Sequence, residues 1–97
     1  MNAPKAAVVI LNYNGKHWLE QFLPGVIAGT PADDAEIIVA DNASTDDSVS
    51  FLQSHFPDIR VIQNSNNNGY AGGYNEALSH VKSEYYILLN SDVEVSP

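Results

Sequence analysis

The chain has 97 residues with 12 acidic and 4 basic side chains, so its formal charge is −8, and it contains no cysteine. This length leaves room for one compact domain with one core, which excludes a two-lobed enzyme. The basic residues are scattered singly, which excludes nucleic acid as a partner, because a phosphate backbone is bound by clustered positive charge. The absence of cysteine excludes disulfides, thiolate zinc sites and cysteine nucleophiles.

The first part of the chain predicts two buried strands separated by a helix. The apolar run 6–11 is rich in β-branched residues and too short for a helix or a membrane span, so it predicts a central parallel strand of a soluble, cytoplasmic protein. Apolar residues repeat at intervals of three and four over 17–27, which predicts an amphipathic helix that Pro24 should kink or end. After turn-forming residues at 29–34, the run 36–41 predicts a second buried strand.

The middle of the chain predicts a second helix and a third strand. Ser44 and Asp47 have the spacing of a capping box, which predicts a helix from about 45 to 55. The partial alternation of apolar residues over 59–63 predicts a strand near an edge of the sheet.

The last part completes an alternating pattern of strands and helices. The polar segment 64–69 leads into helical spacing over 70–81, and the run 85–89 predicts a fourth strand. The sequence therefore predicts an α/β fold in one domain, residues 1–97. We expect a Rossmann-like, mainly parallel sheet of about four strands with helices on both faces.

Polar residues follow each predicted strand, where open parallel α/β sheets bind their ligands. These segments are Asn12-Tyr13-Asn14-Gly15, Asp41-Asn42, the stretch from Asn64 to Gly73, and Asn90-Ser91-Asp92. This coincidence is the strongest functional signal in the sequence.

Each candidate residue has a structural interpretation beside the functional one. Asp92 is a candidate ligand for a divalent cation such as Mg²⁺, or else a helix N-cap or solvated loop acid. Asp41 is placed to accept hydrogen bonds from a base or ribose, or else to be a turn or N-cap residue before the next helix. Tyr13 is suited to stacking on a nucleobase, or else to covering the core. The segment Gly69-Tyr70-Ala71-Gly72-Gly73 matches no dinucleotide or phosphate-loop pattern, and is either a loop that lets a ligand approach the backbone or a flexible turn.

Taken together, these motifs resemble the N-terminal, nucleotide-sugar-binding part of a family 2 glycosyltransferase of the GT-A fold. The later motifs resemble most the bacterial rhamnosyltransferase-like branch, which assembles surface polysaccharides. The matching segments are 8–15, 38–46, 68–75 and 88–92.

The resemblance implies a role for most of these polar residues. Tyr13 would lie against the base of a nucleoside diphosphate sugar such as dTDP-rhamnose or a UDP-sugar, Asp41 would contact the base or ribose, and the loop 68–75 would border the ribose and diphosphate. The residues implied to bind the donor are Asn12, Tyr13, Asn14, Asp41, Asn42, Asn68, Gly69, Gly72, Gly73, Asn75 and Asn90.

The resemblance also implies a metal ligand and a missing catalytic group. Asp92 would hold Mg²⁺ or Mn²⁺ against the diphosphate, whereas Asn90 departs from the acidic first position of the family's D-x-D motif. The family's catalytic base would lie beyond Pro97, so we expect a donor-binding part that by itself transfers no sugar. Strand edges and apolar surface left uncovered in such a part predict self-association.

The acceptor implied by the resemblance is a glycan or a lipid-linked molecule, which would place a cytoplasmic protein peripherally at the inner face of the bacterial membrane. The alternative is a non-enzymatic nucleotide-binding or receiver-like signalling module. A receiver would need an acidic cluster after the first strand, where this chain has Asn12, Tyr13 and Asn14.

Overall fold

The computed structural model describes residues 6–30, 35–65, 69–81, 83 and 85–90, in which strands and helices alternate as the sequence predicts. The elements are β1 (Ala6–Asn12), α1 (Lys16–Ala28), β2 (Ala35–Asp41), α2 (Ser48–His55), β3 (Arg60–Gln63), α3 (Gly69–Leu78) and β4 (Tyr85–Asn90).

The strands form one parallel sheet in the order β3-β2-β1-β4. The prediction of a central first strand is confirmed, and so is the edge position of the third. The register places Asn12 beside Asp41, Asp41 beside Gln63, and Leu11 beside Asn90. The carboxyl ends of all four strands therefore meet at one edge of the sheet, which we call the carboxyl edge.

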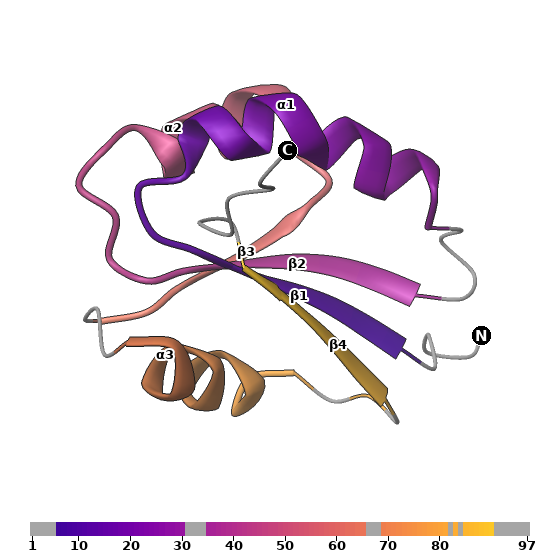
Figure 1. Ribbon diagram of the computed structural model, residues 1–97, viewed down its shortest axis with the longest axis vertical. Helices are drawn as coiled ribbons and strands as arrows, with labels where there is room; N and C mark the ends of the chain where they lie inside the picture. Colours follow the sequence, from indigo (N-terminus) through magenta and orange to yellow (C-terminus); the bar gives the residue numbers. More distant parts are fainter. Residues whose placement is uncertain (1–5, 31–34, 66–68, 82, 84, 91–97) are drawn as a thin grey trace, which may run out of the picture.

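Helices cover both faces of the sheet, as predicted. Figure 1 shows α1 and α2 on one face and α3 on the other. On the α1 and α2 side, Leu19, Leu23 and Leu52 pack with Val8 and Ile10 of β1. On the α3 side, Ala77 and Val81 pack with the alternate residues of β1 and β2. The continuous apolar runs of β1 and β2 are explained by this burial on both faces.

Helix α1 runs through Pro24, so of the two predicted effects of this proline, a kink or the end of the helix, the second is wrong. The proline removes the backbone donor that would reach the carbonyl of Glu20. Leu23 before the proline is fully buried, and Val26 and Ile27 after it pack on the same core, while Pro24 itself is exposed. Packing on both sides of the proline outweighs one lost hydrogen bond.

Helix α2 begins at Ser48, three residues later than predicted, and the proposed capping box is wrong. Asp47 occupies the N-cap position but makes no side-chain cap hydrogen bond. The backbone N–H of Ser44 donates to Asp41, and that of Ser48 donates to Asp46. Residues 42–47 are therefore organised as a loop by these two carboxylates.

Helix α3 begins at Gly69, so the predicted ligand-binding loop 68–75 is helical from Gly69 onward. The helical spacing that the sequence shows from Tyr70 extends back over the glycine-rich segment. Glycine disfavours a helix interior by up to about 1 kcal/mol, so packing against the sheet must compensate for it here. Among the described helices, none is both long and apolar enough to cross a membrane.

Candidate functional site

Buried polar side chains gather at the carboxyl edge. Asn12 and Asp41 end β1 and β2, while Asn42 and Asn64 directly follow β2 and β3, and each is at most 5% exposed. We call these four residues the strand-end cluster. Because buried polar groups are costly unless they are hydrogen-bonded, their gathering here rather than across the core points to a positioned site.

Asp41 organises the first part of the cluster. Its Oδ1 accepts hydrogen bonds from Nδ2 of Asn12 at 2.9 Å and from the hydroxyl of Ser44 at 2.6 Å. Its Oδ2 accepts one from the backbone N–H of Ser44 at 2.9 Å. The interpretation of Asp41 as a turn-forming residue is therefore confirmed, and its contact with a base or ribose stays a prediction.

Asn14 joins the loops that follow β1 and β2. Its Oδ1 accepts hydrogen bonds from the backbone N–H groups of Thr45 at 2.7 Å and Asp46 at 3.1 Å, and its own N–H donates to the hydroxyl of Ser44 at 2.9 Å. Asn14 and Ala43 both have positive φ, at 52° and 61°, which asparagine tolerates more readily than alanine. The amide of Asn14 thus positions a neighbouring loop.

Asn64 links β2, the end of β3 and α3. Its Nδ2 donates to Oδ1 of Asn42 and to the carbonyl of Gly73, both at 3.1 Å, and its N–H donates to the carbonyl of Asp41 at 2.7 Å. Within the described residues, its buried Oδ1 has no hydrogen-bond partner. Asn64 therefore locks α3 to the strand end.

Gly73 lies where α3 comes closest to the sheet. A Cβ atom at this position would meet Leu11 Cδ1 at 2.8 Å and Asn42 Nδ2 at 3.0 Å. Glycine is therefore needed at this position so that α3 can pack closely against Leu11 and Asn42. The sequence suggests a different reason for the glycine, namely the close approach of a ligand.

The remaining predicted residues have different surroundings. Tyr13 is 39% exposed and directly follows Asn12 of the strand-end cluster. Gly72 and Asn75 lie on α3, where Asn75 is exposed. Asn90 ends β4 beside Leu11 at the carboxyl edge, and Asn68 and Asp92 lie outside the described residues.

An exposed ion pair joins the first residue of α1 to the residue before α2. Nζ of Lys16 lies 3.0 Å from the carboxylate of Asp47 and 3.7 Å from that of Glu20. The hydrogen bond with Lys16 lowers the pKa of Asp47 below its ordinary value of 3.8. Asp47, first by its hydrogen bond and then by its charge, raises the pKa of Lys16 above 10.5.

The described carboxylates do not assemble a metal site. No group of three His, Cys, Asp or Glu side chains converges anywhere in the described part of the chain. Near the carboxyl edge, Asp41 is bonded to Asn12 and Ser44, Asp46 accepts from Ser48, and Asp47 pairs with Lys16. Asp92 lies outside the described residues and stays a predicted metal ligand.

Sequence reasoning did not name Ser44 as a member of this site, and it included Asn64 only as the start of the polar stretch after the third strand. Asn64 directly follows β3, and this is the same signal that identified the polar residues after the other strands. Ser44 stands three residues after Asp41, a spacing at which an aspartate bonds to the backbone of a turn. The sequence is therefore compatible with a pairing of Ser44 and Asp41 as well as with the incorrect capping box of Ser44 and Asp47.

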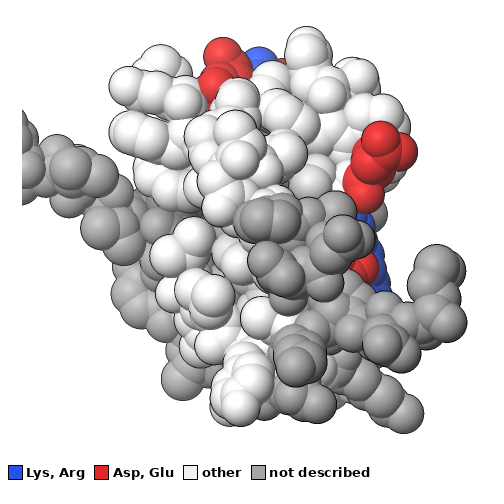
Figure 2. All heavy atoms as spheres, turned by 90° about the vertical axis from the view of Figure 1, so that its right-hand side faces the viewer, with Lys and Arg blue, Asp and Glu red and all other residues white. Residues whose placement is uncertain are grey.

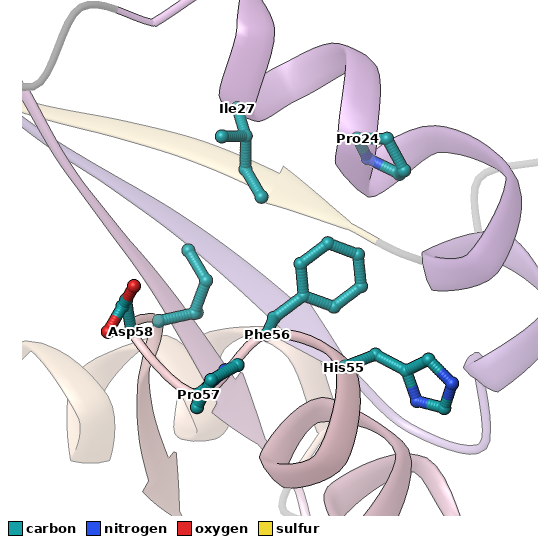
Figure 3. Close-up of a pocket in the computed structure, with 7 residues that line it drawn as sticks. Pro24, Ile27, His55, Phe56, Pro57 and Asp58 are labelled. Atoms are coloured by element: carbon teal, nitrogen blue, oxygen red, sulfur yellow. The ribbon is translucent and has the colours of Figure 1, made fainter.

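A separate hollow of about 410 Å³ lies away from the carboxyl edge, next to the amino end of β3. Its lining is mostly apolar and comes from the second half of α1, the end of α2 and the turn before β3 (Figure 3). His55 and Asp58 contribute its polar groups. Since these two are not joined by a buried network like that at the carboxyl edge, we place the candidate site at the carboxyl edge.

Figure 2 shows the charged side chains of the described residues on one face of the molecule, where they form a few small groups among uncharged ones.

The chain is similar to bacterial glycosyltransferases along most of its length. It is 35% identical over 91 residues to the uncharacterized glycosyltransferase YfnE of Bacillus subtilis, covering 92% of this chain and 23% of that protein. It is 32% identical over 93 residues to the poly(ribitol-phosphate) beta-glucosyltransferase of Bacillus spizizenii, covering 91% of this chain and 15% of that protein. The chain thus spans a quarter or less of the length of these relatives.

A solved structure shares the fold. The mannosyltransferase PcManGT from Pyrobaculum calidifontis, in complex with GDP-Man and Mn²⁺, matches with a TM-score of 0.79 and 27% identity, over 94% of this chain and 28% of that chain.

The model of the glycosyl transferase family 2 matches residues 7–97. This match favours the transferase prediction over the receiver-like alternative. With a parallel sheet of the GT-A type and its polar residues gathered at the carboxyl edge, the chain belongs to glycosyl transferase family 2.

Proposed function

We propose that this chain is the donor-binding part of a family 2 glycosyltransferase and binds a nucleoside diphosphate sugar, with Mg²⁺ or Mn²⁺, at the carboxyl edge. The observation that carries the proposal is the strand-end cluster, whose buried hydrogen bonds fix the ends of β1, β2 and β3 and the middle of α3 relative to one another. The bound GDP-Man and Mn²⁺ of the similar mannosyltransferase support the choice of ligand.

In this proposal, the nucleoside lies against the ends of β1 and β2. Tyr13 stacks on the base, which its exposed ring beside the buried cluster makes sterically feasible. Asp41 and Asn42 form the floor for the base or ribose, while Asn12 and Asn14 hold that floor and its loops in place.

The diphosphate is proposed to lie between α3 and the end of β4. The first turn of α3, with Gly69 and Gly72, offers backbone N–H groups at a helix N-terminus, which favours anions. Asn68, Asn75 and Asn90 border this space in the proposal. Asp92 is the proposed metal ligand, and a cation there would offset negative charge on the leaving nucleoside diphosphate.

The finer assignment concerns the sugar and the acceptor. We propose a UDP-sugar or dTDP-rhamnose as donor, and a glycan or lipid-linked acceptor in the assembly of a bacterial surface polymer. The relative from Bacillus spizizenii, a poly(ribitol-phosphate) beta-glucosyltransferase, supports a polymer as acceptor. The proposal assigns donor binding to this chain, and assigns the catalytic base and acceptor contacts to residues beyond Pro97.

A thermal-shift titration with UDP, dTDP and GDP, each with and without Mn²⁺, tests donor binding. A ligand at about 100 times its Kd stabilises the folded state by about 2.7 kcal/mol, which is readily measured. We expect one nucleotide to raise the Tm in the presence of Mn²⁺, and Asp92→Ala to remove the metal-dependent part. The matched control is Asp58→Ala, an exposed acid outside the carboxyl edge.

Two results would contradict the proposal. One is the absence of any shift with all three nucleotides while circular dichroism shows an intact fold. The other is an equal effect of Asp92→Ala and Asp58→Ala. The assignment of the base beyond Pro97 fails if the purified chain transfers sugar from the donor that it binds.

A further inference from the structure

The hydroxyl of Ser44 forms three hydrogen bonds at the carboxyl edge. It donates to Oδ1 of Asp41 at 2.6 Å, and it accepts from the backbone N–H of Asn14 at 2.9 Å and from Nδ2 of Asn12 at 3.3 Å. A serine hydroxyl has one donor and two acceptor positions, so all of them are used. The backbone N–H of Ser44 also donates to Oδ2 of Asp41 at 2.9 Å. Ser44 is therefore fixed on the carboxylate of Asp41 through both its side chain and its backbone.

The two residues that donate to this hydroxyl flank Tyr13 in the sequence. Asn12 is the last residue of β1 and precedes the tyrosine, while Asn14 follows it. Asn14 has a φ of 52°, a left-handed backbone that most residues avoid, and the hydrogen bond from its N–H to Ser44 helps to hold it. The chain on both sides of Tyr13 is thus tied to one oxygen atom.

Tyr13 itself depends on this tie for its orientation. The residue is 39% exposed. Within the part of the chain that the structure describes, its side chain makes no hydrogen bond of its own. The rotamers open to a side chain depend on the backbone that carries it. The direction of the Tyr13 ring is therefore governed by the backbone of residues 12–14, and hence by Ser44.

We propose that Ser44 is a positioning residue that couples Tyr13 to Asp41, so that the ring and the carboxylate present one fixed surface to the nucleoside. The inference rests on the proposed function, in which Tyr13 stacks on the base and Asp41 contacts the base or ribose. Binding groups of this kind work only when supporting hydrogen bonds hold them to within about 0.5 Å of the productive geometry. Ser44 supplies that support without touching the ligand.

The coupling differs from a purely structural role in one measurable respect. If Ser44 acts through the ring, its removal weakens nucleotide binding only while the ring of Tyr13 is present. If Ser44 merely stabilises the loop, or acts through Asp41 alone, its removal has the same effect on binding whether the ring is present or not.

Hydrogen exchange tests the tie at Tyr13 without any nucleotide. We expect Ser44→Ala to speed exchange of the Asn14 N–H by about tenfold or more, because this N–H loses its acceptor. The N–H of Ile10, inside β1 between its two neighbouring strands, should keep its rate. Ser54→Ala is the matched control, since Ser54 is an exposed serine on α2, and it should change neither rate. Unchanged exchange at Asn14, or an equal rise at Ile10, would overturn the proposal.

A double-mutant cycle on nucleotide binding tests the coupling itself. Calorimetry with UDP, dTDP and GDP in the presence of Mn²⁺ gives Kd for the parent, Ser44→Ala, Tyr13→Ala and the double variant. For the nucleotide that binds, we expect Ser44→Ala to weaken binding about tenfold with Tyr13 present, and less than about twofold in the Tyr13→Ala background. Circular dichroism checks that each variant is folded. If Ser44→Ala is not, Ser44→Cys takes its place, because a thiol is of similar size and forms only weak hydrogen bonds.

The two measurements separate this inference from the proposed function. Equal weakening by Ser44→Ala in both backgrounds contradicts the coupling and leaves donor binding intact. If a folded parent chain binds none of the three nucleotides, the proposed function fails, and hydrogen exchange at Asn14 alone decides whether Ser44 holds the backbone beside Tyr13.

Discussion

Asn12 donates a hydrogen bond of 2.9 Å to the carboxylate of Asp41, and the two residues are register partners at the ends of neighbouring strands. Both side chains are buried. The pair therefore fixes the carboxyl ends of β1 and β2 relative to each other, and the loops that follow both strands are built on it.

Asp41→Ala is expected to destabilise the fold strongly. The substitution removes the carboxylate that accepts hydrogen bonds from the buried amide of Asn12 and from the backbone N–H of Ser44, and we expect a loss of about 2 to 4 kcal/mol in the free energy of unfolding. Urea denaturation measures this loss. Asp58→Ala, in an exposed turn, should change stability by less than about 0.5 kcal/mol. Similar values for the two variants would remove Asp41 from the centre of the network.

Asn64→Asp should be more harmful than Asn64→Ala. The aspartate places a carboxylate oxygen against the carbonyl oxygens of Asn42 and Gly73, where the amide now donates to both. We expect losses of about 1 to 3 kcal/mol for alanine, and more for aspartate, because the buried charge would have no counter-charge. Urea denaturation compares the two, with Ser65→Ala as an exposed control. An aspartate variant as stable as the parent would mean that Asn64 does not hold α3.

Gly73→Ala and Gly25→Ala make a matched pair of helix glycines. The added methyl at Gly73 would press on Leu11 and on the held side chain of Asn42, and we expect a loss of about 1 to 3 kcal/mol. At Gly25 nothing lies within 4 Å of the added atom. Alanine there should stabilise α1 by up to about 1 kcal/mol. Thermal melts of the two variants should therefore shift in opposite directions, and shifts of the same sign would disprove the tight contact.

The ion pair of Lys16 and Asp47 predicts a small dependence of stability on acid. Because the folded pKa of Asp47 is lowered, the contribution of the pair is present above the ordinary value of 3.8 and is lost as pH falls through the lowered value. The pKa of Lys16 is raised, so its contribution is present below 10.5 and is lost as pH rises through the raised value. Asp47→Asn should therefore lower the Tm slightly at neutral pH and have no effect in strong acid.

Salt is the control for that ion pair. Because the two side chains are exposed, high salt should screen most of the difference between the parent and Asp47→Asn at neutral pH. A difference that persists in strong acid or at high salt would instead point to a change in the loop before α2.

The fold followed from the sequence wherever periodicity and burial agree. The continuous apolar run of β1 predicted a central strand, and the partial alternation of β3 predicted an edge. Local rules failed where tertiary packing outweighs them. Pro24 does not end α1, because apolar residues on both sides of it pack into one core. Helix α3 includes the glycine-rich segment, because Gly73 allows close contact with the sheet.

The candidate site was predictable in location but not in its internal connections. The rule that polar residues follow parallel strands correctly gathered Asn12, Asp41 and Asn42 at one edge. The hydrogen bonds among them depend on loop conformations that cannot be predicted from the sequence. Ala43 is an example, because its backbone is left-handed and alanine rarely adopts that conformation. Ser44 was therefore paired with the wrong aspartate.

The parallel order of the strands also governs when this domain can be completed during synthesis. β1 lies between β2 and β4, and its register with β4 joins Ala6 to Tyr85, which stand near opposite ends of the chain. Pairings between distant segments form slowly, and the ribosome delivers the N-terminal strand first. During synthesis, the side of β1 that pairs with β4 therefore stays without its partner until β4 has been made.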